Sequence, residues 1–164
     1  VYKLWSKWGA NNMAKVFEDL FMELQTDMVC ACLDYVDDRA DKVYVYGSCE
    51  GNTIACDYFY EVNGKIVDRV ELKDISDDYD VSYKNQGVCL RTLIDDLKDM
   101  SSLCKEYNRP MPTEIKLTYD VEKNSLQTHY CYEPQYSWHK TRMSDDVAND
   151  WYKALKKEIK KRKL

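Results

Sequence analysis

Apolar residues recur at steps of three and four in two long stretches, and each stretch predicts a helix. The first helix, capped at Asn11 or Asn12, is expected to reach Tyr35, with an inward stripe of Met13, Val16, Phe17, Leu20, Phe21, Leu24, Met28 and Cys32. The second is expected over 88–107 with Leu90, Leu93, Ile94, Leu97, Met100, Leu103 and Cys104 inward. Two prolines, Pro110 and Pro112, end it.

A period of two predicts five strands between and after these helices. Three are expected at 43–46, 53–62 and 65–72, and the Asn63-Gly64 pair is a strong hairpin signal between the last two. Two more are expected at 113–121 and 126–132. Residues 74–86 are polar and rich in turn formers, so they are predicted to be a loop.

A third helix is predicted to begin at Ser144, a good N-cap. Acidic residues follow this cap and lysines fill the last turns, which suits the helix dipole. The order α-β-β-β-α-β-β-α predicts an α+β fold, with an antiparallel sheet of about five strands and helices packed on one face. The other face would then display many of the fourteen tyrosines. We expect one domain over residues 1–164, with residues 1–9 as an arm or a short helical turn.

The net charge of −5 is unevenly distributed. Residues 34–100 hold sixteen acidic and eight basic side chains, whereas residues 101–164 hold nine acidic and thirteen basic ones. An acidic surface repels nucleic acid and attracts basic proteins. The predicted partner-binding residues lie in and beside the 74–86 loop: Asp74, Asp77, Asp78, Tyr79, Asp80 and Tyr83. The carboxylates would replace nucleic-acid phosphates, and the two tyrosines would serve as buried anchors.

Seven cysteines show no even framework of spacings, which is typical of reduced thiols. No apolar run is long enough to span a membrane, and no signal-peptide core is present at the start. We therefore expect a cytoplasmic protein. Cys30 and Cys32 lack the spacing of a redox or zinc motif and would point to different faces of a helix.

No catalytic, metal or cofactor motif stands out, so a binding protein is predicted rather than an enzyme. The 74–80 run lacks the central glycine and final glutamate of a calcium loop, and no glycine-rich phosphate loop is present. One alternative is a hydrolase that uses carboxylates near His129. A nucleophilic pair of Cys131 and His129 lacks a recognisable orienting acid, so an ordinary strand histidine explains His129 more simply. Another is a nucleic-acid-associated module that uses the lysine-rich 156–163 segment, although a solvated helix end explains that segment more simply.

Several short segments carry a family resemblance: Val43–Tyr46, Cys56–Tyr60, Pro112–Tyr119, Tyr130–Tyr132, Arg142 and Trp151–Leu155. In these segments and in the order of its elements, over roughly residues 13–155, the chain resembles the YezG-like family of bacterial immunity proteins. It differs in two places: residues 144–149 separate the arginine from the tryptophan, and Asn124-Ser125-Leu126 replaces the usual Gly-Lys-Phe. The resemblance implies a small cytoplasmic antitoxin that binds a cognate toxin, commonly a nuclease, and blocks it. The oligomeric state does not follow from the sequence.

Overall fold

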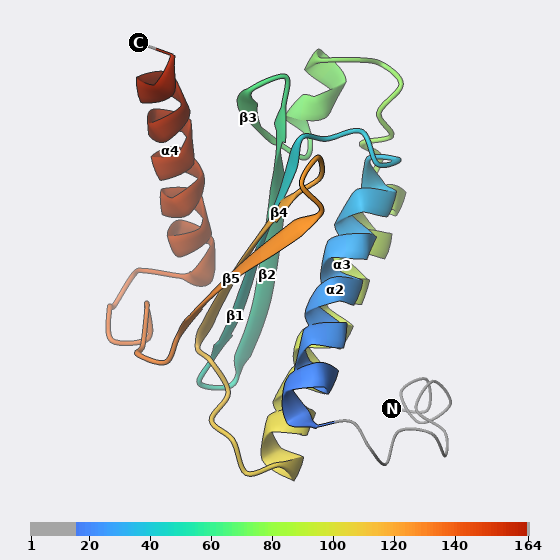
Figure 1. Ribbon diagram of the computed structural model, residues 1–164. Coiled ribbons are helices and arrows are strands. Elements are labelled where there is room, and N and C mark those ends of the chain that lie inside the picture. Colours follow the sequence, from blue (N-terminus) through green and yellow to red (C-terminus); the bar gives the residue numbers. More distant parts are fainter. Residues whose placement is uncertain (1–15, 164) are drawn as a thin grey trace.

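The computed structural model describes residues 16–163 (Figure 1). Its elements are α2 (Phe17–Tyr35), β1 (Lys42–Glu50), β2 (Thr53–Val62), β3 (Lys65–Asp68), the 3-10 turn η2 (Glu71–Asp74), α3 (Tyr83–Glu106), β4 (Glu114–Asp120), β5 (Ser125–Cys131) and α4 (Ser144–Arg162). The α+β class and the predicted order of elements are confirmed. The expected caps Asn11 and Asn12 and the arm at 1–9 lie outside the described residues.

Some boundaries differ from the prediction for local reasons. α3 begins at Tyr83, because the Ser82 hydroxyl accepts the backbone N–H of Asn85 at 3.2 Å and caps the helix. α4 is capped at Met143 rather than Ser144, and the Asp146 carboxylate accepts the Met143 N–H at 2.8 Å. Strand β3 ends at residue 68, before η2.

The five strands are antiparallel in the order β3-β2-β1-β4-β5. At the β2–β3 hairpin, Asn63 and Gly64 both adopt positive φ angles, 52° and 67°. A two-residue hairpin turn of type I′ requires such angles, so the hairpin predicted at Asn63-Gly64 is confirmed.

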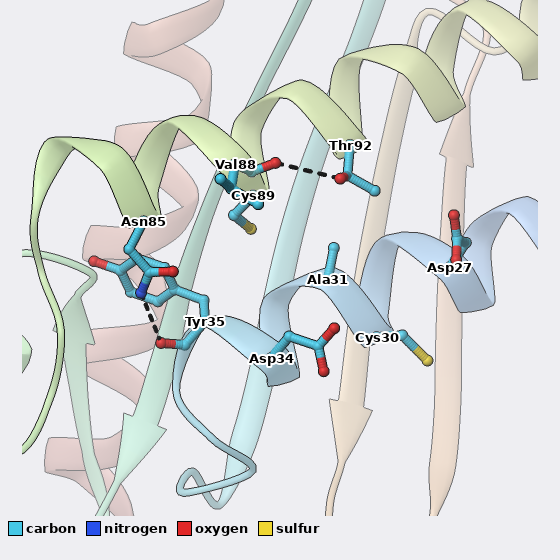
Figure 2. Close-up of a pocket in the computed structure, with 9 residues that line it drawn as sticks. All are labelled: Asp27, Cys30, Ala31, Asp34, Tyr35, Asn85, Val88, Cys89 and Thr92. Atoms are coloured by element: carbon cyan, nitrogen blue, oxygen red, sulfur yellow. Dashed lines mark hydrogen bonds between the residues drawn. The ribbon is translucent and has the colours of Figure 1, made fainter.

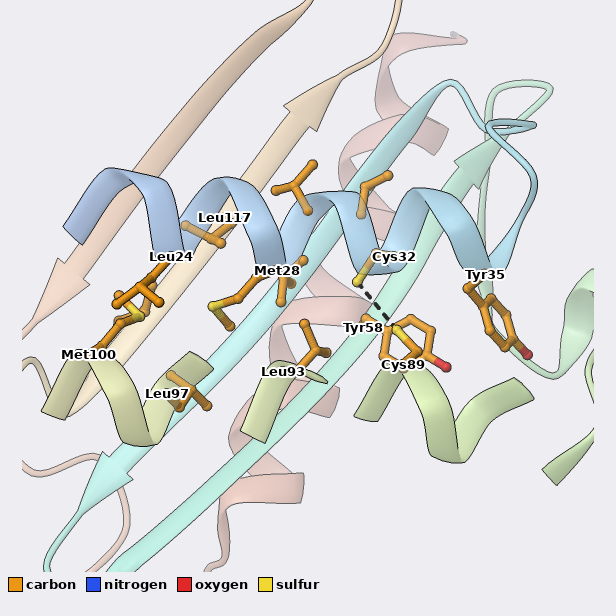
Figure 3. Close-up of a cluster of buried hydrophobic side chains, with 14 of the residues drawn as sticks. Leu24, Met28, Cys32, Tyr35, Tyr58, Cys89, Leu93, Leu97, Met100 and Leu117 are labelled. Atoms are coloured by element: carbon orange, nitrogen blue, oxygen red, sulfur yellow. Dashed lines mark hydrogen bonds between the residues drawn. The ribbon is translucent and has the colours of Figure 1, made fainter. Parts of the chain in front are cut away.

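Helices α2 and α3 lie side by side on one face of the sheet and enclose the main core with it (Figures 1 and 3). Val43 and Val45 of β1 contribute to this core together with Met28 of α2 and Leu93 of α3. Gly47 allows α3 to approach β1 closely, because a Cβ there would lie 2.9 Å from a methyl carbon of Leu97.

The prediction that all helices pack on one face is wrong. Helix α4 lies on the opposite face (Figure 1), where Tyr44, Phe59 and Ile66 are buried beneath the α4 residues Trp151, Tyr152, Leu155 and Ile159. The physical reason is that both alternate sets of β1 side chains are bulky and apolar, so both faces need cover. Tyr44 and Tyr46, expected on an open face, are accordingly buried on the α4 side, whereas Tyr58 and Tyr60 are buried in the main core.

None of the helices within residues 16–163 combines the length and the apolar character needed to cross a membrane.

Candidate binding surface

Two acidic segments that are distant in the sequence meet at one end of the molecule. The turn after α2 contacts the loop after η2 through Arg39, whose Nη2 donates to the Asp78 carbonyl at 3.0 Å and lies 3.6 Å from the Asp37 carboxylate. The Tyr79 hydroxyl donates to the Arg39 carbonyl at 2.7 Å, and the guanidinium lies over the Tyr79 ring at 4.4 Å. These contacts fix the two segments against each other.

The start of α3 adds to this arrangement. The Asn85 side-chain amide donates to the carbonyls of Tyr35, at 3.2 Å, and of Asp80, at 2.7 Å. It thereby ties the end of α2 to the acidic loop. We call the resulting exposed surface the acidic end, which consists of Asp34, Asp37, Asp38, Asp77, Asp78 and Asp80.

The structure places the predicted site residues unequally. Asp77, Asp78 and Asp80 are exposed at the acidic end, whereas Asp74 is exposed on η2. Tyr79 is half-buried against the main core and, as described, donates its hydroxyl within the chain, so it holds the loop in place.

Tyr83, the second predicted anchor, lies in the first turn of α3 rather than in the loop and is 92% exposed. It therefore presents almost its whole ring to solvent beside the acidic end, which is where a partner could cover it.

Hydrogen bonds favour the charged form of one carboxylate at the acidic end. Asp80 accepts the backbone N–H of Ser82 at 3.0 Å. Hydrogen bonds from the Ser82 side chain and backbone lower the pKa of Asp80 below its ordinary value. This carboxylate is thus negatively charged at neutral pH.

A groove of about 280 Å³ runs between α2 and α3 and adjoins the acidic end (Figure 2). It is lined by Asp27, Cys30, Ala31, Asp34, Tyr35, Asn85, Val88, Cys89 and Thr92. Asp27 and Asp34 on α2 line this groove, so the negative charge of the acidic end continues into it. This groove was not predicted from the sequence. The only signal for it was the seven-residue spacing of Asp27 and Asp34, about two helical turns, which places both on one face of the helix.

A second hollow, of about 630 Å³, lies beside the start of α4 and is lined by Gln135, Trp138, His139, Thr141, Arg142, Asp146, Asn149, Asp150 and Lys153. Its charges are mixed, since Arg142 and Asp150 form an ion pair at 2.6 Å. Trp138 is 70% exposed there. Sequence reasoning did not identify this hollow.

The segment that leads to this hollow is held by the buried Glu50 of β1. The Glu50 carboxylate accepts the backbone N–H groups of Gln135, Tyr136 and Ser137 at 2.7–3.2 Å. Burial raises the pKa of Glu50, but hydrogen bonds from Ser137, Gln135 and Tyr136 outweigh that effect and lower it. The hydroxyls of Ser48 and Tyr136 lie 3.0 Å apart and join the same connection to β1.

The residues behind the two alternative functions lie elsewhere. His129 is exposed on strand β5, at an edge of the sheet, and lines neither hollow. In the C-terminal lysine segment, Lys156 lies 3.8 Å from the Glu71 carboxylate and Lys163 donates to the Gly64 carbonyl at 2.8 Å. Within residues 16–163, no group of three or more His, Cys, Asp or Glu side chains is placed to hold a metal ion.

No family model and no curated protein matches the sequence. The resemblance to the YezG-like family, and the immunity function that it implies, therefore stay predictions.

Proposed function

We propose that this is a cytoplasmic immunity protein that binds a basic toxin domain, a nuclease, and blocks it without chemistry of its own. One observation supports this above the others. Arg39 and Tyr79, forty residues apart, join two acidic segments into one exposed surface. A nuclease has a cationic cleft for phosphates, and such a cleft is complementary to this surface.

The way the surface is built favours fast and specific capture. Opposite charges accelerate encounter of the two proteins, and the effect weakens as salt screens the charges. The contacts of Arg39, Tyr79 and Asn85 hold the acidic end before binding, so less conformational freedom is lost on association. Tyr83 supplies an exposed aromatic ring that the partner can bury.

The direct test uses the toxin domain encoded next to this protein. The two purified proteins are mixed, their binding is measured by calorimetry, and the residual activity of the toxin is measured in parallel. We expect a one-to-one complex and loss of toxin activity. A toxin that stays fully active in the presence of excess protein would overturn the proposal.

A sharper test reverses three charges at the acidic end: Asp77→Lys, Asp78→Lys and Asp80→Lys. We expect the association rate constant at low salt to fall by about tenfold or more, and its salt dependence to flatten, because steering is lost. Stopped-flow mixing over a range of salt concentrations measures both effects.

The matched control reverses three exposed acids outside the acidic end: Glu106→Lys, Glu122→Lys and Glu133→Lys. It changes the net charge by the same amount, so it reports the effect of overall charge alone. Equal rates for the two triple variants would show that the acidic end is not the contact surface.

A further inference from the structure

Two cysteines meet in the main core, where α2 packs against α3. The sulfur atoms of Cys32 and Cys89 lie 3.9 Å apart, within hydrogen-bonding distance for thiols (Figure 3). Both side chains are buried, Cys32 completely and Cys89 with 3% of its surface exposed. A disulfide needs about 2 Å between the two sulfur atoms, so the sulfur atoms must move closer by about 2 Å for the bond to form.

The two thiols are chemically unequal. The hydrogen bond from Cys32 lowers the pKa of Cys89, burial opposes this effect, and the positive charge of Arg69 lowers the pKa further. Burial raises the pKa of Cys32. Cys89 is therefore the more readily deprotonated thiol of the pair.

Access from solvent follows the same order. Cys89 lines the groove between α2 and α3, whereas Cys32 does not (Figure 2). A small oxidant that enters the groove therefore meets Cys89 before Cys32. Burial raises the pKa of other cysteines, Cys30, Cys49, Cys56 and Cys104, which makes them weaker nucleophiles.

We propose that Cys32 and Cys89 are a modification site, a dithiol that hydrogen peroxide converts to a reversible disulfide between α2 and α3. In the first step the Cys89 thiolate attacks one peroxide oxygen, the O–O bond breaks, and water leaves once the departing oxygen is protonated. Cys89 then carries a sulfenic acid. In the second step Cys32 attacks that sulfur, the S–S bond forms, and the sulfenic oxygen leaves as water. The pair loses two electrons and two protons, and each peroxide yields two waters.

This inference does not depend on the proposed function, because it concerns only the chemistry of the chain. The disulfide would cross-link residues 57 positions apart and fix the spacing of the two helices along the wall of the groove.

The test treats the reduced, full-length protein with stoichiometric hydrogen peroxide. Remaining thiols are then blocked with iodoacetamide, and the intact protein and its peptides are analysed by mass spectrometry. Compared with the reduced and alkylated control, we expect a lower mass from two fewer carbamidomethyl groups, one cross-linked peptide pair that contains Cys32 and Cys89, and full reversal by dithiothreitol. The same treatment in concentrated urea should scatter the cross-links over several cysteines, because the native contact is lost.

Three variants assign the roles. Cys89→Ser should form no disulfide under the same conditions, whereas Cys32→Ser should stop at the sulfenic acid of Cys89, which dimedone traps. Cys30→Ser removes an exposed thiol in the same groove and should oxidise like the unmodified protein. Circular dichroism checks that each variant is folded.

The mapping of the unmodified protein decides the question even if a variant fails to fold. No mass loss at stoichiometric peroxide, or native cross-links that mainly involve other cysteines, would overturn the proposal.

Discussion

The two faces of the sheet are covered in different ways. On the face under α2 and α3 the helices pack largely aliphatic and sulfur-containing side chains, including Met28, Leu93 and Leu97, which retain no exposed surface, against strand residues that include Tyr58 and Tyr60. The face under α4 is covered by aromatic rings, and Trp151 of α4 remains partly exposed. The difference shows that one strand can present two kinds of surface, each of which selects its own helix.

Strand β1 shows how this works residue by residue. Val43 and Val45 face the main core, where branched side chains pack densely. On the opposite face, Tyr44 lies 5.3 Å from Phe59, and Phe59 lies 5.2 Å from Trp151, measured between ring centroids. The first pair is stacked and the second is edge to face. Trp151 keeps part of its surface in solvent, whereas Met28, Leu93 and Leu97 keep none. The α2–α3 face should therefore account for more stability per residue than the α4 face.

The largest effect is expected from Leu97→Ala on the α2–α3 face. It leaves a cavity in a fully buried position next to Gly47 and should lower the free energy of unfolding by about 2–5 kcal/mol. Urea denaturation monitored by circular dichroism measures the change. A loss below about 1 kcal/mol, as expected for the substitution of an exposed residue, would contradict the larger contribution of the α2–α3 face.

A smaller loss is expected from Trp151→Ala on the α4 face. Because the indole is partly exposed, the loss should be roughly 2 kcal/mol, below the range for a fully buried tryptophan. Trp138→Ala is the matched control, since that side chain is 70% exposed and its loss should change stability by about 0.5 kcal/mol or less. If Trp151→Ala proved more destabilising than Leu97→Ala, the ranking of the two faces would be reversed.

Apart from the Trp138 control, the smallest effect is expected from Glu50→Gln, which tests the attachment of the segment that leads to α4. An amide oxygen accepts the three backbone N–H groups less strongly than a carboxylate, so the loss should be about 1 kcal/mol at neutral pH.

This effect should depend on pH in a defined direction. Folding lowers the pKa of Glu50, so its contribution is complete above the pKa of the unfolded chain and disappears as pH falls through the folded value. Urea midpoints for the two proteins should therefore converge in acid. A difference that stays constant from neutral pH into acid would rule out the charge of Glu50 as its source.

Much of the fold was readable in the sequence because its patterns are local. The alternation over 53–62 predicted β2 to the residue, and Asn63-Gly64 predicted its turn. The side on which α4 packs was not readable in the same way. Tyrosine is equally suited to an exposed face and to a buried one. Tyr44 and Tyr46 therefore did not indicate whether their face of the sheet is open to solvent or covered by a helix.

The candidate site shows the same division. The exposed aspartates at 77, 78 and 80 were visible as a charged run. Their meeting with Asp37 was not, because it depends on how α2 and η2 end relative to each other, and the only local signal was an isolated arginine, Arg39. The contact of Cys32 with Cys89 likewise depends on how α2 packs against α3. The helical periodicity of each segment does not show which of their residues meet.

The attachment by Glu50 also affects how α4 stays associated with the sheet. The chain that leads to α4 is fastened at residues 135–137, so only the short stretch from Trp138 to Met143 remains between that anchor and the helix. Because this linker is short, a detached α4 stays at high effective concentration near the sheet, and little conformational entropy is lost when it packs again. Opening of the aromatic face can therefore be a partial and quickly reversed event, while the rest of the molecule stays folded.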